Sequence, residues 1–308
     1  MWVIPREVFD SRLVDAAVAA GAVLRRHRVR GVEVGPDGVV LDGALRAPVV
    51  VGADGVHSVV RAAVGLGRPG RRALALRGYA PTPADRRGTQ VIAYGERRQP
   101  SYAWAFDRGD GLSNVGYGEL LAGGDDEATP RAVLLEQLEL LLPGSTDGGR
   151  GWRGHHLPLS GWSWQQPDGP VLLAGDAASL VNPMTGEGIY YAVATGIRAG
   201  RAAAAAVADG TPALAGAAYR REVRRLLARH LRHTTVASRL SRSPRWVGAG
   251  ITAARRDPGA FDDLVEIGLG RGVITPRLVN GLVNGLVNGL VRGPARGGTD
   301  GVPGRPAP

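Results

Sequence analysis

The stretch from Val171 to Tyr191 constrains the fold of this chain more than any other. It opens with the apolar run Val171–Ala174, which has the character of a buried strand. A Gly-Asp pair and a loop bracketed by glycines follow, and apolar residues then recur at helical spacing over 189–197. The pattern predicts a strand, a tight loop and a helix that begins near Gly186 and runs past Gly200.

The N-terminus of this predicted helix faces the loop. Unpaired N–H groups there carry partial positive charge, and glycines let a ligand approach the backbone closely, so the geometry suits an anion. The alternative is a plain connection in which Asp176 only caps or hydrogen-bonds the backbone. For an isolated Gly-Asp pair, that alternative is favoured.

Two further stretches of the sequence also look like motifs. Val49–Val51 precede Gly52-Ala53-Asp54-Gly55, and the aromatic run Tyr102-Ala103-Trp104-Ala105-Phe106 is followed by Asn114-Val115-Gly116. Together with Gly175-Asp176, and in this order, they resemble FAD-dependent oxidoreductases of the para-hydroxybenzoate hydroxylase structural class. Within that class the chain is most similar to the geranylgeranyl reductase family, over most of residues 1–205.

The resemblance implies an α/β fold in several parts. A truncated FAD-binding parallel-sheet domain is expected at residues 1–65 and 165–205, with an inserted antiparallel β-sheet substrate domain at 66–164. A C-terminal helical region is expected at 206–293, and a disordered Gly/Pro/Arg tail at 294–308.

The N-terminus departs from the family pattern. Flavoproteins of this class open with a strand, a Gly-x-Gly-x-x-Gly turn and a helix whose N-terminus holds the FAD pyrophosphate. This chain begins instead near Arg6-Glu7-Val8-Phe9-Asp10, which resembles a later segment of the family. We therefore expect a truncated gene, a misassigned start codon or a fragment, and weak FAD binding by residues 1–308.

The resemblance assigns cofactor roles to both glycine-containing motifs. Asp176 would accept hydrogen bonds from the ribityl hydroxyls of FAD, and the following helix would place partial positive charge beside the isoalloxazine. Asp54-Gly55 would contact the pyrophosphate region. The expected cofactor-binding residues are Arg6, Asp54, Gly55, Ser58, Arg61, Gly175, Asp176, Pro183, Gly186 and Gly188.

Tyr102, Trp104 and Phe106 alternate along the chain, so a strand would project all three from one face. The pattern alone favours ordinary sheet-core packing. In the family, however, this aromatic strand lines an isoprenoid cavity, and the resemblance therefore makes these three the expected substrate-binding residues. Asp107 departs from the family's proline at that point and places a charge at the end of the strand.

The reaction that the resemblance implies is reduction of a C=C bond in a geranylgeranyl-type isoprenoid by hydride transfer from reduced FAD. NAD(P)H or a ferredoxin would supply the electrons, and either Tyr102 or a water molecule the proton. One alternative is a flavin-dependent monooxygenase or halogenase-like enzyme of the same fold. A second is a non-catalytic fragment or a membrane-surface interaction module.

The amino-acid composition limits the kinds of partner and site that we expect. The chain has a formal net charge of +10, and all 38 of its basic residues are arginine. The arginines are scattered without interleaved aromatics, so we expect no nucleic acid partner despite the charge. The absence of cysteine excludes disulfides and thiolate catalysis, and no metal site is expected. No apolar run is long enough to span a membrane, which makes a cytoplasmic protein the default expectation.

Several helices are also predicted. Asp10 or Ser11 would cap a first helix, and leucines at helical spacing follow Thr129-Pro130. Residues 216–242 form an arginine-rich helical pattern whose basic face is either solvated or seated on anionic lipid, the latter implying peripheral association at the inner membrane face. The repeated tetrad Leu278-Val279-Asn280-Gly281 predicts only a weak helix or flexible apolar segment, because each glycine costs about 1 kcal/mol relative to alanine.

Overall fold

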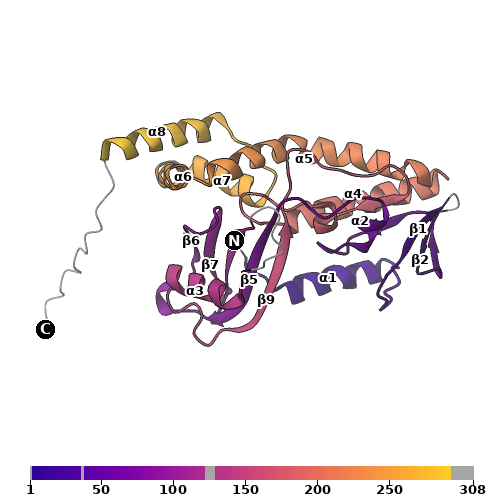
Figure 1. The fold of residues 1–308 in the computed structure, drawn as a ribbon, viewed down its shortest axis with the longest axis horizontal. Helices are drawn as coiled ribbons and strands as arrows, with labels where there is room; N and C mark the ends of the chain where they lie inside the picture. The colour runs from indigo at the N-terminus through magenta and orange to yellow at the C-terminus, as the bar shows by residue number, and fades with distance from the viewer. Residues whose placement is uncertain (1, 36–37, 122–128, 293–308) are drawn as a thin grey trace.

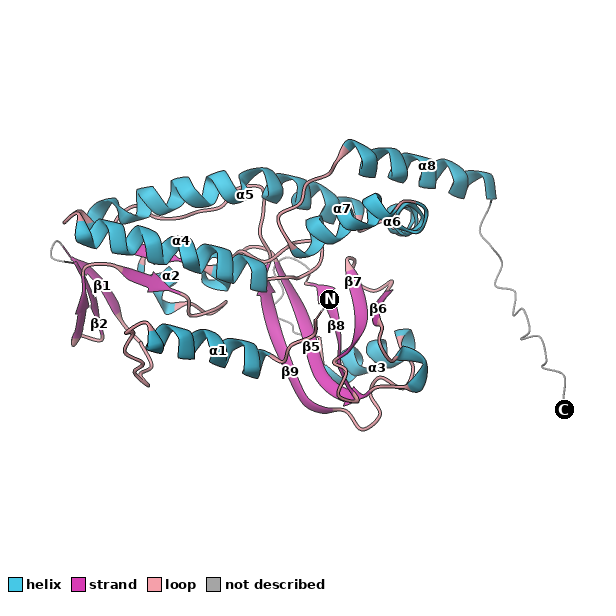
Figure 2. Ribbon diagram, turned by 180° about the vertical axis from the view of Figure 1, so that it is seen from behind, coloured by secondary structure: helices cyan, strands magenta, loops and turns pink. Residues whose placement is uncertain are grey.

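The structure is a computed structural model that describes residues 2–35, 38–121 and 129–292. It confirms the expected α/β class, with a parallel pair of strands, a separate antiparallel sheet and a C-terminal group of helices (Figure 1 and Figure 2). The expected tail at 294–308 lies outside the described residues. None of the described helices is long and apolar enough to cross a membrane.

Two short parallel strands carry the two glycine-containing motifs. β4 (Val50–Gly52) and β10 (Val171–Leu173) pair in register. Against them pack α2 (Val59–Ala63), α4 (Ile189–Ala208) and α5 (Ala215–Leu240). Because the loops that follow parallel strands emerge at the same edge of a sheet, this pairing brings the two motifs together.

The antiparallel sheet has the strand order β6-β7-β8-β5-β9. One face is covered by α3 (Arg131–Leu141), where the predicted leucine stripe buries Leu134 and Leu138. The other face carries the aromatic side chains of β7 and reaches the loop before α4. The strands are β5 (Arg72–Pro81), β6 (Gln90–Tyr94), β7 (Ser101–Asp107), β8 (Leu112–Leu120) and β9 (Arg150–Pro158).

The first helix begins earlier than predicted. α1 (Arg6–Ala19) starts after Pro5, so neither Asp10 nor Ser11 is its cap. The reason is that the Asp10 carboxylate pairs with Arg6 one turn before it, at 2.9 Å, inside the helix. α1 buries none of its side chains against the described residues.

The remaining elements complete the two ends of the molecule. A small meander lies near α1, and three further helices follow α5 (Figure 1). In α5 itself, Val223 and Leu227 are fully buried and lie on the apolar side of the arginine-rich helix. The remaining bounds are β1 (Val32–Gly35), β2 (Gly38–Leu41), β3 (Leu45–Ala47), α6 (Pro244–Arg256), α7 (Pro258–Leu269) and α8 (Pro276–Arg292), with short 3-10 turns at Ala84–Arg86, Gly175–Ala178 and Pro212–Leu214.

The tetrad repeat forms a continuous helix, α8, in agreement with the helical alternative of the prediction rather than with a flexible segment. Two glycines of this helix face α6 at close range, which explains why glycine is tolerated there. A Cβ atom on Gly285 would lie 2.8 Å from the carbonyl oxygen of Ala249, and one on Gly281 would lie 2.8 Å from the Cβ of Ala253. Packing between helix backbones offsets the low helix propensity of glycine.

We expect Gly285→Ala to destabilise the helical region by about 1–3 kcal/mol, since the added methyl group would collide with the α6 backbone. Gly248→Ala is the matched control, because no atom lies within 4 Å of a Cβ added to Gly248 in α6. That control should be neutral or should gain up to about 1 kcal/mol from helix propensity. Thermal unfolding followed by circular dichroism measures both, and equal stabilisation by the two substitutions would contradict the close α6–α8 contact.

Candidate functional site

The loop between β10 and α4 is organised by two glycines in the left-handed region. Gly175, at φ 57°, opens the 3-10 turn after the strand, and a Cβ there would lie 3.1 Å from the Cβ of Ala192. Gly186, at φ 70°, turns the chain toward α4, which begins at Ile189 rather than near Gly186. Only glycine adopts these conformations without strain, so both positions require it.

The loop is tied to the C-terminal helices by a buried asparagine that the sequence analysis did not single out. Asn182 accepts a hydrogen bond from the Met184 N–H at 2.9 Å and donates to the carbonyl oxygen of Ile267 at 2.8 Å. The Thr185 hydroxyl donates to the carbonyl of Gly268 at 2.7 Å. The Asn-Pro dipeptide at 182–183 is a turn signal that points to a role for Asn182. Pro183 is buried within this loop.

Glu187 is a second residue that the sequence analysis missed, and it changes how the helix N-terminus is used. Its carboxylate accepts hydrogen bonds from the backbone N–H groups of Ile189, at 2.5 Å, and Tyr190, at 3.2 Å. The first donors of α4, which the sequence analysis left open to a ligand, are therefore bound by the chain's own carboxylate. Burial raises the pKa of Glu187, and these backbone hydrogen bonds oppose that shift.

Asp176 lies beside the same helix start. A Cβ added to Gly188 would lie 3.4 Å from Asp176 Oδ1, and the side chain is half-buried. Its carboxylate accepts no hydrogen bond from any residue within the described part of the chain. Burial raises the pKa of Asp176, and the charge of Arg6 opposes this. A half-buried carboxylate with free acceptor capacity suits a ligand that presents hydroxyl donors.

Arg6 connects α1 to this cluster through its charge. It lowers the pKa of both Asp176 and Glu187, although burial dominates each shift in the opposite direction. It is also among the cations that lower the pKa of His155, after burial and Arg77. The Arg6 guanidinium itself pairs with Asp10 at 2.9 Å, and the side chain remains 55% exposed.

The Asp54-Gly55 motif lies next to this loop but uses its polar groups internally. The Asp54 carboxylate accepts the Ser58 hydroxyl at 2.6 Å and the Val59 N–H at 2.8 Å, which caps α2. Gly55 is in the left-handed region at φ 81°. Arg61 extends from α2 to the carbonyl oxygen of Ala177, at 3.2 Å, and so ties the two motifs together.

The three predicted aromatic residues share one face of β7, as the alternation predicts. Tyr102, Trp104 and Phe106 are partly exposed, whereas the intervening Ala103 and Ala105 face the buried core under α3. The Tyr102 and Trp104 rings lie 5.8 Å apart.

The Asn114-Val115-Gly116 signature holds the Trp104 ring. Asn114 Oδ1 accepts the Trp104 indole N–H at 2.9 Å. Gly116 lies directly opposite Trp104 on β8, and a Cβ there would lie 2.3 Å from the indole ring. The glycine therefore leaves the room in which the indole lies flat on the sheet.

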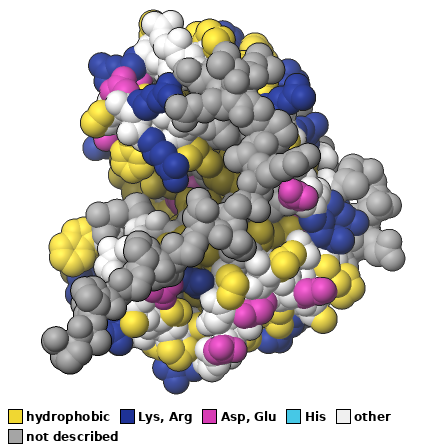
Figure 3. All heavy atoms as spheres, turned by 90° about the vertical axis from the view of Figure 1, so that its left-hand side faces the viewer, with side chains coloured by type: hydrophobic (Ala, Val, Ile, Leu, Met, Phe, Trp, Pro, Cys, Tyr) yellow, Lys and Arg dark blue, Asp and Glu magenta, His cyan; other side chains and the backbone are white. Residues whose placement is uncertain are grey.

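The aromatic face meets the loop before α4. The Tyr102 hydroxyl donates to the carbonyl oxygen of Thr185, and burial raises the pKa of Tyr102, which keeps that hydroxyl protonated. On β6, Ile92 and Tyr94 extend the apolar face and are 50% and 48% exposed. Figure 3 shows hydrophobic side chains gathered in a hollow at this end of the molecule. That the aromatic residues border a substrate cavity remains a prediction.

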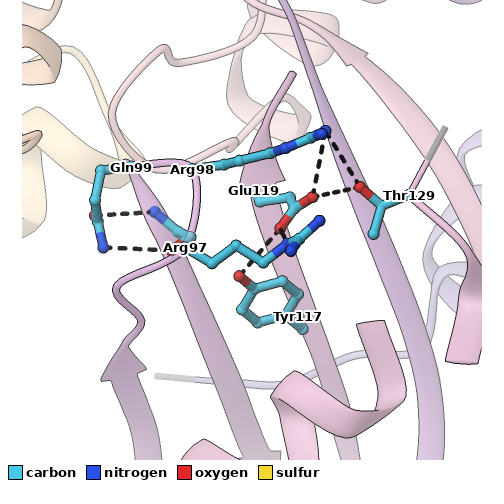
Figure 4. Close-up of polar contacts among 7 residues, drawn as sticks. Arg97, Arg98, Gln99, Tyr117, Glu119 and Thr129 are labelled. Carbon is cyan, nitrogen blue, oxygen red and sulfur yellow. Dashed lines mark hydrogen bonds and ion pairs between the residues drawn. The ribbon is translucent and has the colours of Figure 1, made fainter. Parts of the chain in front are cut away.

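On β8, a buried carboxylate stabilises the β6–β7 connection (Figure 4). Glu119 accepts hydrogen bonds from Arg97 at 3.0 Å, Thr129 at 2.5 Å and Tyr117 at 3.3 Å, and Arg98 lies at 3.8 Å. Burial raises the pKa of Tyr117 to about 12. Because these cations and donors already satisfy the Glu119 carboxylate, its role is to position β7 rather than to react.

A buried histidine joins the first turn of α4 to the helical region. Tyr191 and His230 are each 1% exposed, and their Oη and Nε2 atoms are 2.5 Å apart. His230 Nδ1 lies 2.6 Å from the carbonyl oxygen of Gly272. A carbonyl can only accept, so Nδ1 carries the proton and Nε2 accepts from the Tyr191 hydroxyl. Burial lowers the pKa of His230, consistent with a neutral ring.

Known proteins with similar sequences identify the family of this chain. A digeranylgeranylglycerophospholipid reductase from Methanothrix thermoacetophila is 29% identical over 75% of this chain and 63% of its own length. Digeranylgeranylglycerophospholipid reductase 2 from Methanopyrus kandleri is 31% identical over 68% of this chain and 57% of its own length. Over the matched residues, this chain belongs to the geranylgeranyl reductase family. It spans less than two thirds of the length of either relative.

Solved structures show the fold of the family. The crystal structure of a geranylgeranyl bacteriochlorophyll reductase-like protein from Thermoplasma acidophilum matches with a TM-score of 0.69 and 19% identity, over 93% of this chain and 74% of that one. Anhydrotetracycline hydroxylase from Streptomyces rimosus matches with a TM-score of 0.57 and 21% identity, over 86% and 56%. The geranylgeranyl reductase family therefore shares its fold with hydroxylases. No protein-family model matches the chain.

The lowered pKa of His230 predicts a pH dependence of stability. The folded protein binds fewer protons at this site than the unfolded chain, so the free energy of unfolding should fall as the pH drops below about 6.5, by about 1.4 kcal/mol for each unit of pKa difference. His230→Gln should lose much of this acid sensitivity, whereas His57→Gln, at an exposed position, should retain it. Urea unfolding between neutral and mildly acidic pH tests the pair. Identical pH profiles for wild type and His230→Gln would refute the assignment.

Proposed function

We propose that this chain carries the flavin-side loop and substrate face of an FAD-dependent oxidoreductase that reduces C=C bonds in an isoprenoid lipid. The observation that supports this most directly is the contact between Tyr102 and Thr185. It joins the aromatic face of β7 to the loop that holds Asp176, so a bound ring system and an apolar chain would lie next to each other.

The residues of the loop fit FAD. Asp176 has free acceptor capacity for ribityl hydroxyls, and the left-handed Gly186 together with Gly188 keeps the backbone open to a flat ring. Arg6 offers an exposed cation beside them. When bound and reduced, FAD supplies the hydride. Because Glu187 binds the first N–H groups of α4, stabilisation of negative charge on the ring would depend more on Arg6 than on the helix dipole.

The aromatic face would bind and shield the substrate. Trp104, fixed by Asn114 and Gly116, offers a flat apolar surface for an isoprenoid chain, and Tyr102 closes that surface against the loop. Exclusion of water by these rings protects a hydride transfer from side reactions. The raised pKa of Tyr102 keeps a proton on its Oη, at the point where the substrate face meets the flavin loop. Because a raised pKa also makes Tyr102 a weaker acid, either Tyr102 or a water molecule would supply the proton for the second carbon of the reduced bond.

The same proposal includes two further partners. NAD(P)H or a ferredoxin would reduce the flavin. Peripheral association with the cytoplasmic face of a membrane would give access to a lipid-dissolved substrate. The arginine-rich α5 supports this because an anionic surface attracts basic side chains.

Asp176→Ala is expected to weaken FAD binding by about 10- to 1,000-fold, because hydrogen bonds to a charged group contribute about 1.5–3 kcal/mol each. Asp110→Asn, at an exposed hairpin position, is the control and should leave the affinity unchanged. Titration of FAD followed by flavin fluorescence gives both dissociation constants, with circular dichroism to confirm folding. Unchanged affinity in a folded Asp176→Ala variant would remove Asp176 from the site.

The reaction itself is tested by product mass. With chemically reduced FAD and a geranylgeranyl lipid under nitrogen, we expect products heavier by two hydrogen atoms for each reduced bond, and Trp104→Ala should slow their formation. Product that contains a new oxygen atom when air is admitted, with no hydrogenated product under nitrogen, would favour the monooxygenase alternative and overturn the reductase proposal.

A further inference from the structure

One side of α5 carries a row of residues four apart, Arg220, Arg224, Ala228 and Arg232. Residues at this spacing lie above one another on a helix surface. The segment Trp162–Pro167, which leads into β10, runs alongside this row (Figure 1). An open groove therefore lies between an arginine-bearing helix face and a tryptophan-bearing segment.

The groove consists of two adjoining hollows that share Trp164 and Arg224 as walls. One has a volume of about 420 Å³ and is also lined by Leu66 and Arg220. The other has a volume of about 330 Å³ and is also lined by Trp162 and Arg232. Each hollow thus combines an apolar wall with at least one guanidinium group. Neither is lined by an acidic side chain.

The arginines of the groove differ in how they are used. Arg220 is engaged by the chain, with the Gln166 carbonyl oxygen at 2.9 Å and Asp168 at 2.5 Å, so it holds the two walls together. Arg224 and Arg232 are exposed, and neither forms a hydrogen bond or ion pair with residues 2–35, 38–121 or 129–292. Two unpaired guanidinium groups, those of Arg224 and Arg232, therefore lie beside the segment Trp162–Pro167.

The tryptophans add the features of a lipid interface. The Trp162 side chain is 56% exposed, although large apolar side chains are normally buried. The Trp164 Nε1–H is buried and lacks a hydrogen-bond partner within the described chain, and its ring packs edge-on against Tyr219. Tryptophan is enriched where one end of the ring is in contact with apolar chains and the other with polar headgroups.

We propose that the groove between α5 and Trp162–Pro167 is a docking site for the anionic headgroup of a membrane lipid, with Arg224 and Arg232 binding the phosphate and Trp162 entering the interface. A soluble phosphate would need the arginines but not the exposed indole, and the apolar walls favour an amphiphile. This inference rests on the peripheral membrane association proposed above and gives it a location, separate from the flavin loop.

The experiment is co-sedimentation of the whole chain with vesicles of equimolar phosphatidylglycerol and phosphatidylcholine, and with vesicles of phosphatidylcholine alone. We expect binding to the anionic vesicles only. Replacing both free arginines, R224Q with R232Q, should reduce partitioning on the order of 30-fold, given roughly 1 kcal/mol for each arginine near an anionic surface. Trp162→Ala should reduce it as well without changing the net charge.

The matched control is R221Q with R225Q, which removes the same charge from α5 outside the groove, where Arg225 pairs with Glu222 at 2.6 Å. Equal losses from the two double variants would show that only net charge matters and would overturn the site. So would protection by millimolar glycerol phosphate combined with full vesicle binding by Trp162→Ala. Absence of binding to anionic vesicles would remove the membrane association together with the site, yet leave the reductase proposal intact, because vesicle binding requires neither flavin nor turnover.

Discussion

The structure depends on how the loop between β10 and α4 is held from several sides at once. Asn182 and Thr185 fasten it to backbone carbonyls at the end of α7, and Tyr102 fastens it to the antiparallel sheet. These partners come from segments about 80 residues before and after the loop, with separations of 83 and 85 residues for Tyr102 and Ile267. Since each bond ends on a buried or half-buried group, breaking one would leave an unsatisfied carbonyl as well as a freed loop. The rigidity of the β10–α4 loop therefore depends on its packing against α7 and the antiparallel sheet.

The two carboxyl groups at the start of α4 are compensated in different ways. Asp176 and Glu187 are two half-buried carboxyl groups at one helix start, and burial raises the pKa of both. Glu187 is compensated by backbone donors, whereas Asp176 is compensated mainly by the charge of Arg6 from α1. Like charges close together in a partly dry site disfavour double ionisation. The helix α1, which contributes no buried side chain, thus affects the site through electrostatics rather than through packing.

Much of the architecture could be predicted from the sequence, because it depends on local periodicity. The strand-loop-helix around Asp176, the aromatic alternation on β7 and the apolar side of α5 all follow from side-chain spacing. The details that escaped prediction depend on which partner a polar side chain selects, whether that partner is near or distant in sequence. The donors to Glu187, Ile189 and Tyr190, follow it within three residues, but spacing alone does not show that its carboxylate binds them. The acceptor of Asn182, Ile267, lies 85 residues away, and nothing near Asn182 identifies it. The predicted start of α1 was also wrong, since Asp10 pairs with Arg6 within the helix instead of capping it.

The α6–α8 contact has a consequence for how this region tolerates change in length. A tetrad advances about 400° along a helix of 3.6 residues per turn, so successive copies rotate by only about 40°. Gly281 and Gly285 therefore both stay within reach of α6, against Ala253 and Ala249. Adding or deleting one copy of the tetrad beyond them would alter the length of α8 by about 6 Å while leaving these two positions in place. Repeated sequences often allow two helices to pair in the wrong register. Here the repeat would instead allow α8 to change in length without a change in its contacts with α6.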